Sequence, residues 1–291
     1  MINNKKKFSI SKRLAIVDLM GGLGNQIYQV SLAKYLKDLG CHVILNPFWY
    51  ENQKNFKDGT SKRELVFDLK IFNFTILSKS NYVVLEIINK IIMTRLFSKI
   101  RKKLTLPYKL HEGQILNEDN ITYINRFSGY WQITPDIRKN LSFLKTSIIN
   151  NYESLIDHEK IKSNILVHIR KGDYQNINEI LPDRYFQLAL EKLNSFENKK
   201  YDIFTDQTSV DMENNLYKNA SNVFTSSHPL SDFLKMLNYK TYIISNSSYS
   251  YLAALLSNSE HPMVLYPSPW FKNIQHNPTF DSEWKKIEYL K

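Results

Sequence analysis

The chain has 291 residues, of which 43% are hydrophobic, and this is enough for two domains that each bury a core. Lysine and arginine total 39 against 28 acidic residues, and the formal net charge of +11 favours anionic partners such as nucleotide phosphates, nucleic acid or an acidic membrane surface. A single cysteine, Cys41, excludes an intramolecular disulfide and a cysteine-rich zinc site, so a reducing cytoplasm is the expected location.

Strand and helix signals alternate from the beginning of the chain. Residues 14–19 predict a strand, residues 25–39 a helix that ends at Gly40, and residues 42–45 a second strand. Residues 46–140 are less regular. No signal peptide is expected, and no apolar run reaches the length of about 20 residues that a membrane span needs.

A glycine turn separates the first strand from the first helix. Gly22 and Gly24 fit the first two positions of a dinucleotide-binding fingerprint, but Ile27 occupies the third, and this argues against a nicotinamide site. Two explanations remain equally open: a purely structural turn, or a turn that lets a ligand approach the backbone. The candidate contact residues are Gly24, Asn25 and Gln26.

Residues 82–97 have the spacing of an amphipathic helix and lead into a basic run from Arg95 to Lys103. Because most amphipathic helices face a core, we expect this one to do so and the basic run to be solvated. The alternative is a helix that rests on an anionic bilayer.

The alternation resumes in the second half of the chain and predicts further parallel strands. Strands are expected at residues 164–169, 201–205, 222–224, 241–245 and 263–266, and helices at 182–196, 211–217, 230–237 and 247–256. A polar, charged stretch precedes this second series. We therefore expect an α/β protein with two domains, residues 1–155 and 156–291.

The apolar strand at residues 164–169 ends in a charged cluster. Ligands of open α/β sheets bind beyond the carboxyl ends of the strands, and Arg170 would stand there with a planar fork of donors suited to phosphate oxygens. Asp173 follows closely, either as a general base or as a structural partner of Arg170. His168 lies within the strand, where we favour a supporting or ligand-contacting role over catalysis.

Two more strand ends carry polar clusters. Asp206 would either accept hydrogen bonds from a nucleoside or stabilise a turn. The strand at residues 241–245 runs into a helix whose free N–H groups favour phosphate, although these side chains could simply cap it. The candidates at this helix start are Asn246, Ser247, Ser248 and Ser250. No Asp-x-Asp triplet occurs, so a metal-independent reaction without a cofactor is expected.

Read in order, these segments resemble glycosyltransferase family eleven, the α-1,2-fucosyltransferases. The family's amino-terminal motif is similar to residues 21–29, and its His-x-Arg-Arg-Gly-Asp-Tyr signature to residues 168–174. Phe-Ser-Asp-Asp is similar to residues 204–207, and Ser-Asn-Ser-Thr-Phe-Ser-Trp to residues 245–251. Two departures are Lys171 in place of the second arginine and Gln207 in place of the second acid.

The resemblance implies a GT-B-like architecture, with two Rossmann-like domains facing a cleft and the donor GDP-β-L-fucose held mainly by the carboxyl-terminal one. It implies an inverting transfer of L-fucose to the 2-hydroxyl of a galactose in an oligosaccharide or lipid-linked glycan such as an O-antigen. Arg170 would bind the β-phosphate, with Asn246, Ser247 and Ser248 completing that site.

Two alternative functions would leave different signatures in the sequence. Another GDP-sugar or another fucosyl linkage would preserve nearly every motif. A nucleic-acid or phosphate binder without enzymatic activity would explain the charge, but the densest basic run stands apart from the motifs, so no nucleic-acid partner is expected. The expected location is the cytoplasm, with peripheral contact to the membrane as the open question.

Overall fold

The computed structural model describes residues 13–53, 62–92, 108–111, 124–132, 137–155, 163–193, 200–207, 209–225, 228–273 and 277–290. They form two compact units that meet in sequence between Leu144 and Lys145. This point lies within the helix α4 (Leu141–Tyr152), ahead of the domain boundary expected at residue 155. The chain passes from one unit to the next within this helix.

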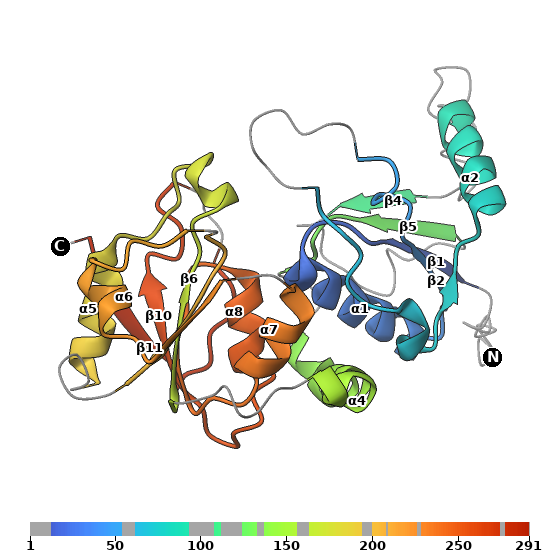
Figure 1. The fold of residues 1–291 in the computed structure, drawn as a ribbon. Coiled ribbons are helices and arrows are strands. Elements are labelled where there is room, and N and C mark those ends of the chain that lie inside the picture. Colours follow the sequence, from blue (N-terminus) through green and yellow to red (C-terminus); the bar gives the residue numbers. More distant parts are fainter. Residues whose placement is uncertain are drawn as a thin grey trace, which may run out of the picture. The chain divides into compact units, whose positions relative to one another are not determined.

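The first unit is a parallel sheet with helices on both faces (Figure 1). Its described strands are β1 (Leu14–Asp18), β2 (His42–Asn46), β3 (Thr75–Ile76), β4 (Tyr108–His111) and β5 (Ile124–Ser128), in the spatial order β3-β2-β1-β5-β4. The helix α1 (Leu23–Asp38) follows β1, and α2 (Lys79–Ile92) follows β3. Gly40, at φ +80°, reverses the chain after α1, as the sequence predicted.

The alternation of side chains along β1 divides the first unit into two cores. Ala15 and Val17 face α1 and pack with its Leu32 and Leu36. Ile16 points to the other face, where it packs with a much smaller set that includes Leu85 of α2. The sheet is thus deeply covered by α1 and only thinly covered by α2.

The second unit is also a parallel sheet between helices (Figure 1). Its described strands are β6 (Ile165–Ile169), β7 (Asp202–Thr205), β8 (Asn222–Thr225), β9 (Thr241–Ile243), β10 (Met263–Ser268) and β11 (Lys285–Glu288), in the order β11-β10-β9-β6-β7-β8. The helices are α5 (Asp183–Lys192), α6 (Asn215–Lys218), α7 (Pro229–Met236) and α8 (Ser248–Leu255). All five residues of β6 are buried, which explains why its sequence is a continuous apolar run rather than an alternating one.

The predicted α/β class with two Rossmann-like domains is confirmed. Within it, β3, β4, β5, β11 and α4 were not predicted. A helix predicted at residues 211–217 is present, but its predicted start is wrong, because α6 begins only at Asn215 and ends at Lys218. Asn214 caps α6 by accepting a hydrogen bond from the backbone N–H of Leu216, and Asp211 accepts one from Glu213, so these residues form turns ahead of the helix.

The amphipathic helix was predicted correctly as α2, but the expectation that its apolar face meets a core is wrong. Val83, Val84, Ile87 and Ile88 are between 41% and 54% exposed. Among the described residues, no helix has the length and apolar character needed to cross a bilayer.

Candidate functional site

The strand order of the second unit determines where a ligand can bind. From β6 the chain proceeds to β7 and β8 on one side, whereas β9, β10 and β11 lie on the other. This reversal creates a switch point between β6 and β9, and ligands of open α/β sheets bind beyond the carboxyl ends of strands at such points. Three of the predicted clusters, which follow β6, β7 and β9, are therefore neighbours at one end of this sheet.

Arg170 follows β6 directly and is largely buried, with its charge shared between two carboxylates. Its Nη1 lies 2.9 Å from Asp206 Oδ2, and its Nη2 lies 2.5 Å from Asp173 Oδ1. Burial opposes the charged guanidinium, but Asp206 and Asp173 outweigh this effect and raise the pKa of Arg170 above its ordinary value. Its Nε is buried without a hydrogen-bond partner among the described residues.

Asp206, at the end of β7, fixes both the arginine and the loop that follows it. In addition to the Arg170 contact, its Oδ1 accepts a hydrogen bond of 2.8 Å from the backbone N–H of Lys171. The next residue is Gly172, and a Cβ added there would lie 2.4 Å from Asp206 Oδ2. The glycine therefore allows the carboxylate to approach the backbone, and both oxygens of Asp206 already have partners within the protein.

His168 is a buried residue of β6, two positions before Arg170, and its side chain carries no charge at neutral pH. Its Nδ1 shares a hydrogen bond of 2.7 Å with Ser245 Oγ, and its ring packs 5.5 Å from the ring of Tyr249. Burial lowers the pKa of His168 to about 3, with Asp206 opposing and Arg170 adding to this effect. The imidazole is therefore buried and held by a hydroxyl partner, an arrangement that suits a supporting role beside Arg170.

The start of α8 contributes backbone donors more than side-chain donors. Ser247 caps the helix by accepting a hydrogen bond from the backbone N–H of Tyr249, and Ser250 Oγ donates to the carbonyl oxygen of Ser247. Asn246 uses its Nδ2 on the carbonyl oxygen of Glu179, and its Oδ1 is buried without a partner among the described residues. Ser248 is partly exposed at the first position of the helix. Its hydroxyl and the free N–H groups of the first turn are the donors that remain for an anion.

The side chains of the glycine turn between β1 and α1 form hydrogen bonds with other parts of the chain. Gly21 adopts φ +79°, and a Cβ there would lie 2.4 Å from Asn25 Nδ2. Gln26 is buried: its Nε2 donates to the carbonyl oxygen of Glu64, and its Oε1 accepts from the backbone N–H of Val66. Asn25 accepts a hydrogen bond of 2.7 Å from Gln132 Nε2. The amides of this turn therefore hold neighbouring loops together, a role that the sequence left open beside ligand contact.

Gly24 is buried in the first turn of α1. Among the described residues, no group of three or more histidine, cysteine or acidic side chains could hold a metal ion.

Sequence reasoning missed Tyr174 and Glu179. The Tyr174 hydroxyl donates to the carbonyl oxygen of Asn246, and its ring lies 5.5 Å from the Arg170 guanidinium. Glu179 is fully buried and accepts hydrogen bonds from the backbone N–H groups of Lys272 and Asn273. An acidic residue next to an apolar one was the only available signal for Glu179, and its partners lie more than ninety residues away.

The second of the two parallel α/β units thus has an arginine, two carboxylates and a helix start at its switch point, which is where open α/β sheets bind ligands. The family model described as glycosyl transferase family 11 matches residues 87–288. The chain belongs to this family.

Two curated relatives span nearly the full chain. One is an alpha-1,2-colitosyltransferase of Escherichia coli, 27% identical, with 94% of this chain and 99% of the relative covered. Another is the O-antigen biosynthesis glycosyltransferase WbnK of Escherichia coli, 25% identical, with 91% and 97% covered. Among solved structures, the fucosyltransferase NodZ from Bradyrhizobium is similar with 15% identity and a TM-score of 0.44, covering 84% of this chain and 93% of that one.

Proposed function

We propose that this glycosyltransferase is an inverting α-1,2-fucosyltransferase that moves L-fucose from GDP-β-L-fucose to the 2-hydroxyl of a galactose-type acceptor in a surface glycan. The observation that carries the proposal is the meeting of Arg170 and the start of α8 at one switch point, within the region that the family model matches. The names of the two Escherichia coli relatives support the α-1,2 linkage and the O-antigen context.

The reaction is a single displacement. The acceptor 2-hydroxyl oxygen bonds to the anomeric carbon as the bond from that carbon to the GDP β-phosphate oxygen breaks, and the electron pair leaves with GDP. Arg170 and the N–H groups of α8 stabilise the negative charge that grows on this oxygen. A lysine at position 170 could not reach Asp173 and Asp206 together, so we expect Arg170→Lys to lose about 10²-fold or more in rate.

Asp173 is the proposed base for the acceptor proton, and its ion pair with Arg170 offers a second role. Asp173→Asn separates the two. If Asp173 is the base, kcat falls by about 10²-fold or more, the acid limb of the pH–rate profile disappears, and the Kd of GDP stays the same. If it only orients Arg170, GDP binding weakens together with the rate and the pH profile keeps its shape.

The first test of the proposal is GDP release from GDP-fucose with a terminal-galactose disaccharide, without added metal. We expect release that depends on the acceptor and that Arg170→Ala abolishes. Arg184→Ala is the matched control, because Arg184 is an exposed arginine of α5 whose ion pair with Glu191 lies on the helix surface. An enzyme that shows no GDP binding would overturn the proposal.

A second candidate donor is a colitose nucleotide, because one relative is named a colitosyltransferase. Colitose lacks the 3-hydroxyl of fucose. A site that hydrogen-bonds that hydroxyl rejects the deoxy sugar strongly, whereas an apolar site discriminates only weakly. Competition between the two GDP-sugars for the same acceptor therefore identifies the donor.

The acceptor is proposed to be a lipid-linked glycan at the cytoplasmic face of the membrane, with the first unit on the acceptor side and the second on the donor side. Of the first-unit candidates, Gly24, Asn25 and Gln26, Asn25 is the side chain proposed to contact a sugar, since Gln26 is fully engaged with backbone groups.

A further inference from the structure

We propose that the outward face of α2, formed by Val83, Val84, Ile87 and Ile88, is a docking surface for an anionic lipid bilayer. This inference does not depend on the sugar that the enzyme transfers. It follows from how α2 is attached to its sheet and from the charge of the chain around it.

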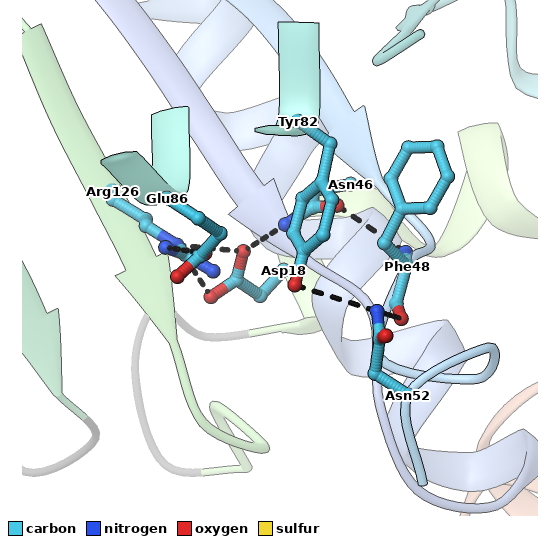
Figure 2. Close-up of polar contacts among 7 residues, drawn as sticks. All are labelled: Asp18, Asn46, Phe48, Asn52, Tyr82, Glu86 and Arg126. Carbon is cyan, nitrogen blue, oxygen red and sulfur yellow. Dashed lines mark hydrogen bonds and ion pairs between the residues drawn. The ribbon is translucent and has the colours of Figure 1, made fainter. Parts of the chain in front are cut away.

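The face of α2 that meets the protein combines an ion pair with an aromatic stack and one buried leucine, and Figure 2 shows the polar part of it. Glu86 of α2 accepts a hydrogen bond of 2.7 Å from Arg126 Nη1 on β5, and the Nε of Arg126 lies 2.9 Å from Asp18 Oδ2 on β1. Tyr82, one turn earlier, stacks on Phe48 with ring centroids 4.7 Å apart. Among the described residues of this face, Leu85 is the one aliphatic side chain that is buried.

The opposite face of α2 is apolar and has no covering among the described residues. Val83, Val84, Ile87 and Ile88 occupy positions i, i+1, i+4 and i+5, which lie on one side of a helix. A helix on the surface of a globular protein normally has the reverse arrangement, with its apolar stripe inward. Large apolar side chains exposed in this way mark an interaction surface when they gather on one element.

The charge of this part of the chain selects the partner. Residues 79–103 contain seven lysines and arginines and one acid, Glu86. Within the described residues Glu86 pairs with Arg126 and Lys79 with Glu51, so the net positive charge of this stretch comes mainly from the basic residues that follow α2 in the sequence. Apolar side chains on one face, together with several basic residues in the adjoining sequence, match the requirements for binding at the surface of an anionic membrane.

Vesicle co-sedimentation of the whole protein tests the proposal. We expect sedimentation with phosphatidylcholine vesicles that contain roughly one third phosphatidylglycerol, little sedimentation with phosphatidylcholine alone, and weakening by salt. The double variant Val84→Gln, Ile87→Gln replaces two apolar side chains by glutamine, which is a good helix former. We expect it to lower the partitioning of the protein onto anionic vesicles at least about tenfold.

Met212→Gln is the matched control, because Met212 is equally exposed, at 53%, but lies in the second unit. It should sediment as the wild type does, and unchanged circular dichroism and GDP binding show that the double variant is folded. Wild-type protein that stays in the supernatant with anionic vesicles overturns the proposal. So does a wild-type dimer that the double variant dissociates without any vesicle binding, since a second copy of the chain would then cover this face.

Discussion

Arg170 sits between Asp173 and Asp206, so the bare cluster carries one more negative than positive charge. An incoming diphosphate would be repelled by these acids unless other groups compensate. The start of α8 supplies partial positive charge on the adjoining strand end, and Lys171 adds a full one. The carboxylates hold the guanidinium in place before the ligand arrives, so little side-chain entropy remains to be lost on binding.

His168 makes the stability of the second unit depend on pH. In the unfolded chain a histidine takes up a proton near pH 6.5, whereas folded His168 does so only near pH 3. Unfolding is therefore favoured as the pH falls through this window, by about 2 kcal/mol between pH 7.5 and pH 5. In urea titrations, His168→Gln should lose less stability over this range than the wild type.

The exposed His261 is the control for this experiment. His261→Gln should keep the pH dependence of the wild type. If His168→Gln also keeps it, the folded His168 is not held in its neutral form.

Gly172 should be intolerant of a side chain. In Gly172→Ala the new Cβ would meet Asp206 Oδ2 at 2.4 Å, and that carboxylate is held by Arg170 and the Lys171 backbone. We expect a loss of about 1–3 kcal/mol in the free energy of unfolding and weaker GDP binding, measured by urea titration and calorimetry.

Gly22→Ala is the contrasting variant, because Gly22 has an ordinary φ of −80° and its nearest neighbour for a Cβ lies 3.9 Å away. It should cost less than about 1 kcal/mol. Equal losses in the two variants would contradict the steric argument.

A buried ion pair joins the strands β1 and β5, and α2 adds Glu86 to it. Asp18 is nearly inaccessible and is paired with Arg126, while Asn46 Nδ2 donates to its Oδ1 at 2.7 Å (Figure 2). Burial disfavours the charged guanidinium, yet Asp18 and Glu86 raise the pKa of Arg126 above its ordinary value. The network therefore joins two strands and a helix through one arginine.

Arg126→Met should destabilise the first unit strongly, by about 3–5 kcal/mol in urea titration, because it leaves the Asp18 charge buried without its partner. The double variant Asp18→Leu, Arg126→Met should recover much of this loss, since apolar side chains can replace a buried ion pair. Glu86→Gln should cost less than about 1 kcal/mol, because Glu86 is about one third exposed. A double variant no more stable than Arg126→Met would argue against charge burial as the cause.

For the whole molecule, the second unit alone carries the proposed nucleotide contacts. GDP at one hundred times its Kd should stabilise the protein by about 2.7 kcal/mol, which a thermal melt detects as a higher Tm. Arg170→Ala should lose this shift. Arg126→Met should have a lower Tm but keep the rise in Tm on GDP binding, because Arg126 lies in the first unit. A shift lost in both variants would mean that GDP binding requires groups from the first unit.

Much of the fold was accessible from sequence because its signals are local. The apolar run at residues 165–169 and the helix that ends at Gly40 depend on neighbours within a few positions, and both were predicted. The strand β5 was missed because Asn125 and Arg126 interrupt its apolar pattern. The position of Arg126 is understandable only with its partner Asp18, more than one hundred residues away in the chain. The edge strand β11 was missed because most of its residues are polar and exposed.

The candidate site divides in the same way into features that local sequence predicts and features that contacts between distant residues decide. The amino-acid order alone identified Arg170, Asp206 and the start of α8 as chemistry-bearing strand ends, because an abrupt change from apolar to charged residues is a local property. Strand pairing brought these ends together and gave Asp206 to Arg170 as a partner, and the packing of the loop at Glu64 against α1 committed Gln26 to backbone groups. The contacts of Glu86, Tyr82 and Leu85 with the sheet left the apolar face of α2 exposed. Periodicity reports that a helix has an apolar face but not what that face meets, since burial is decided by contacts between segments far apart in the chain.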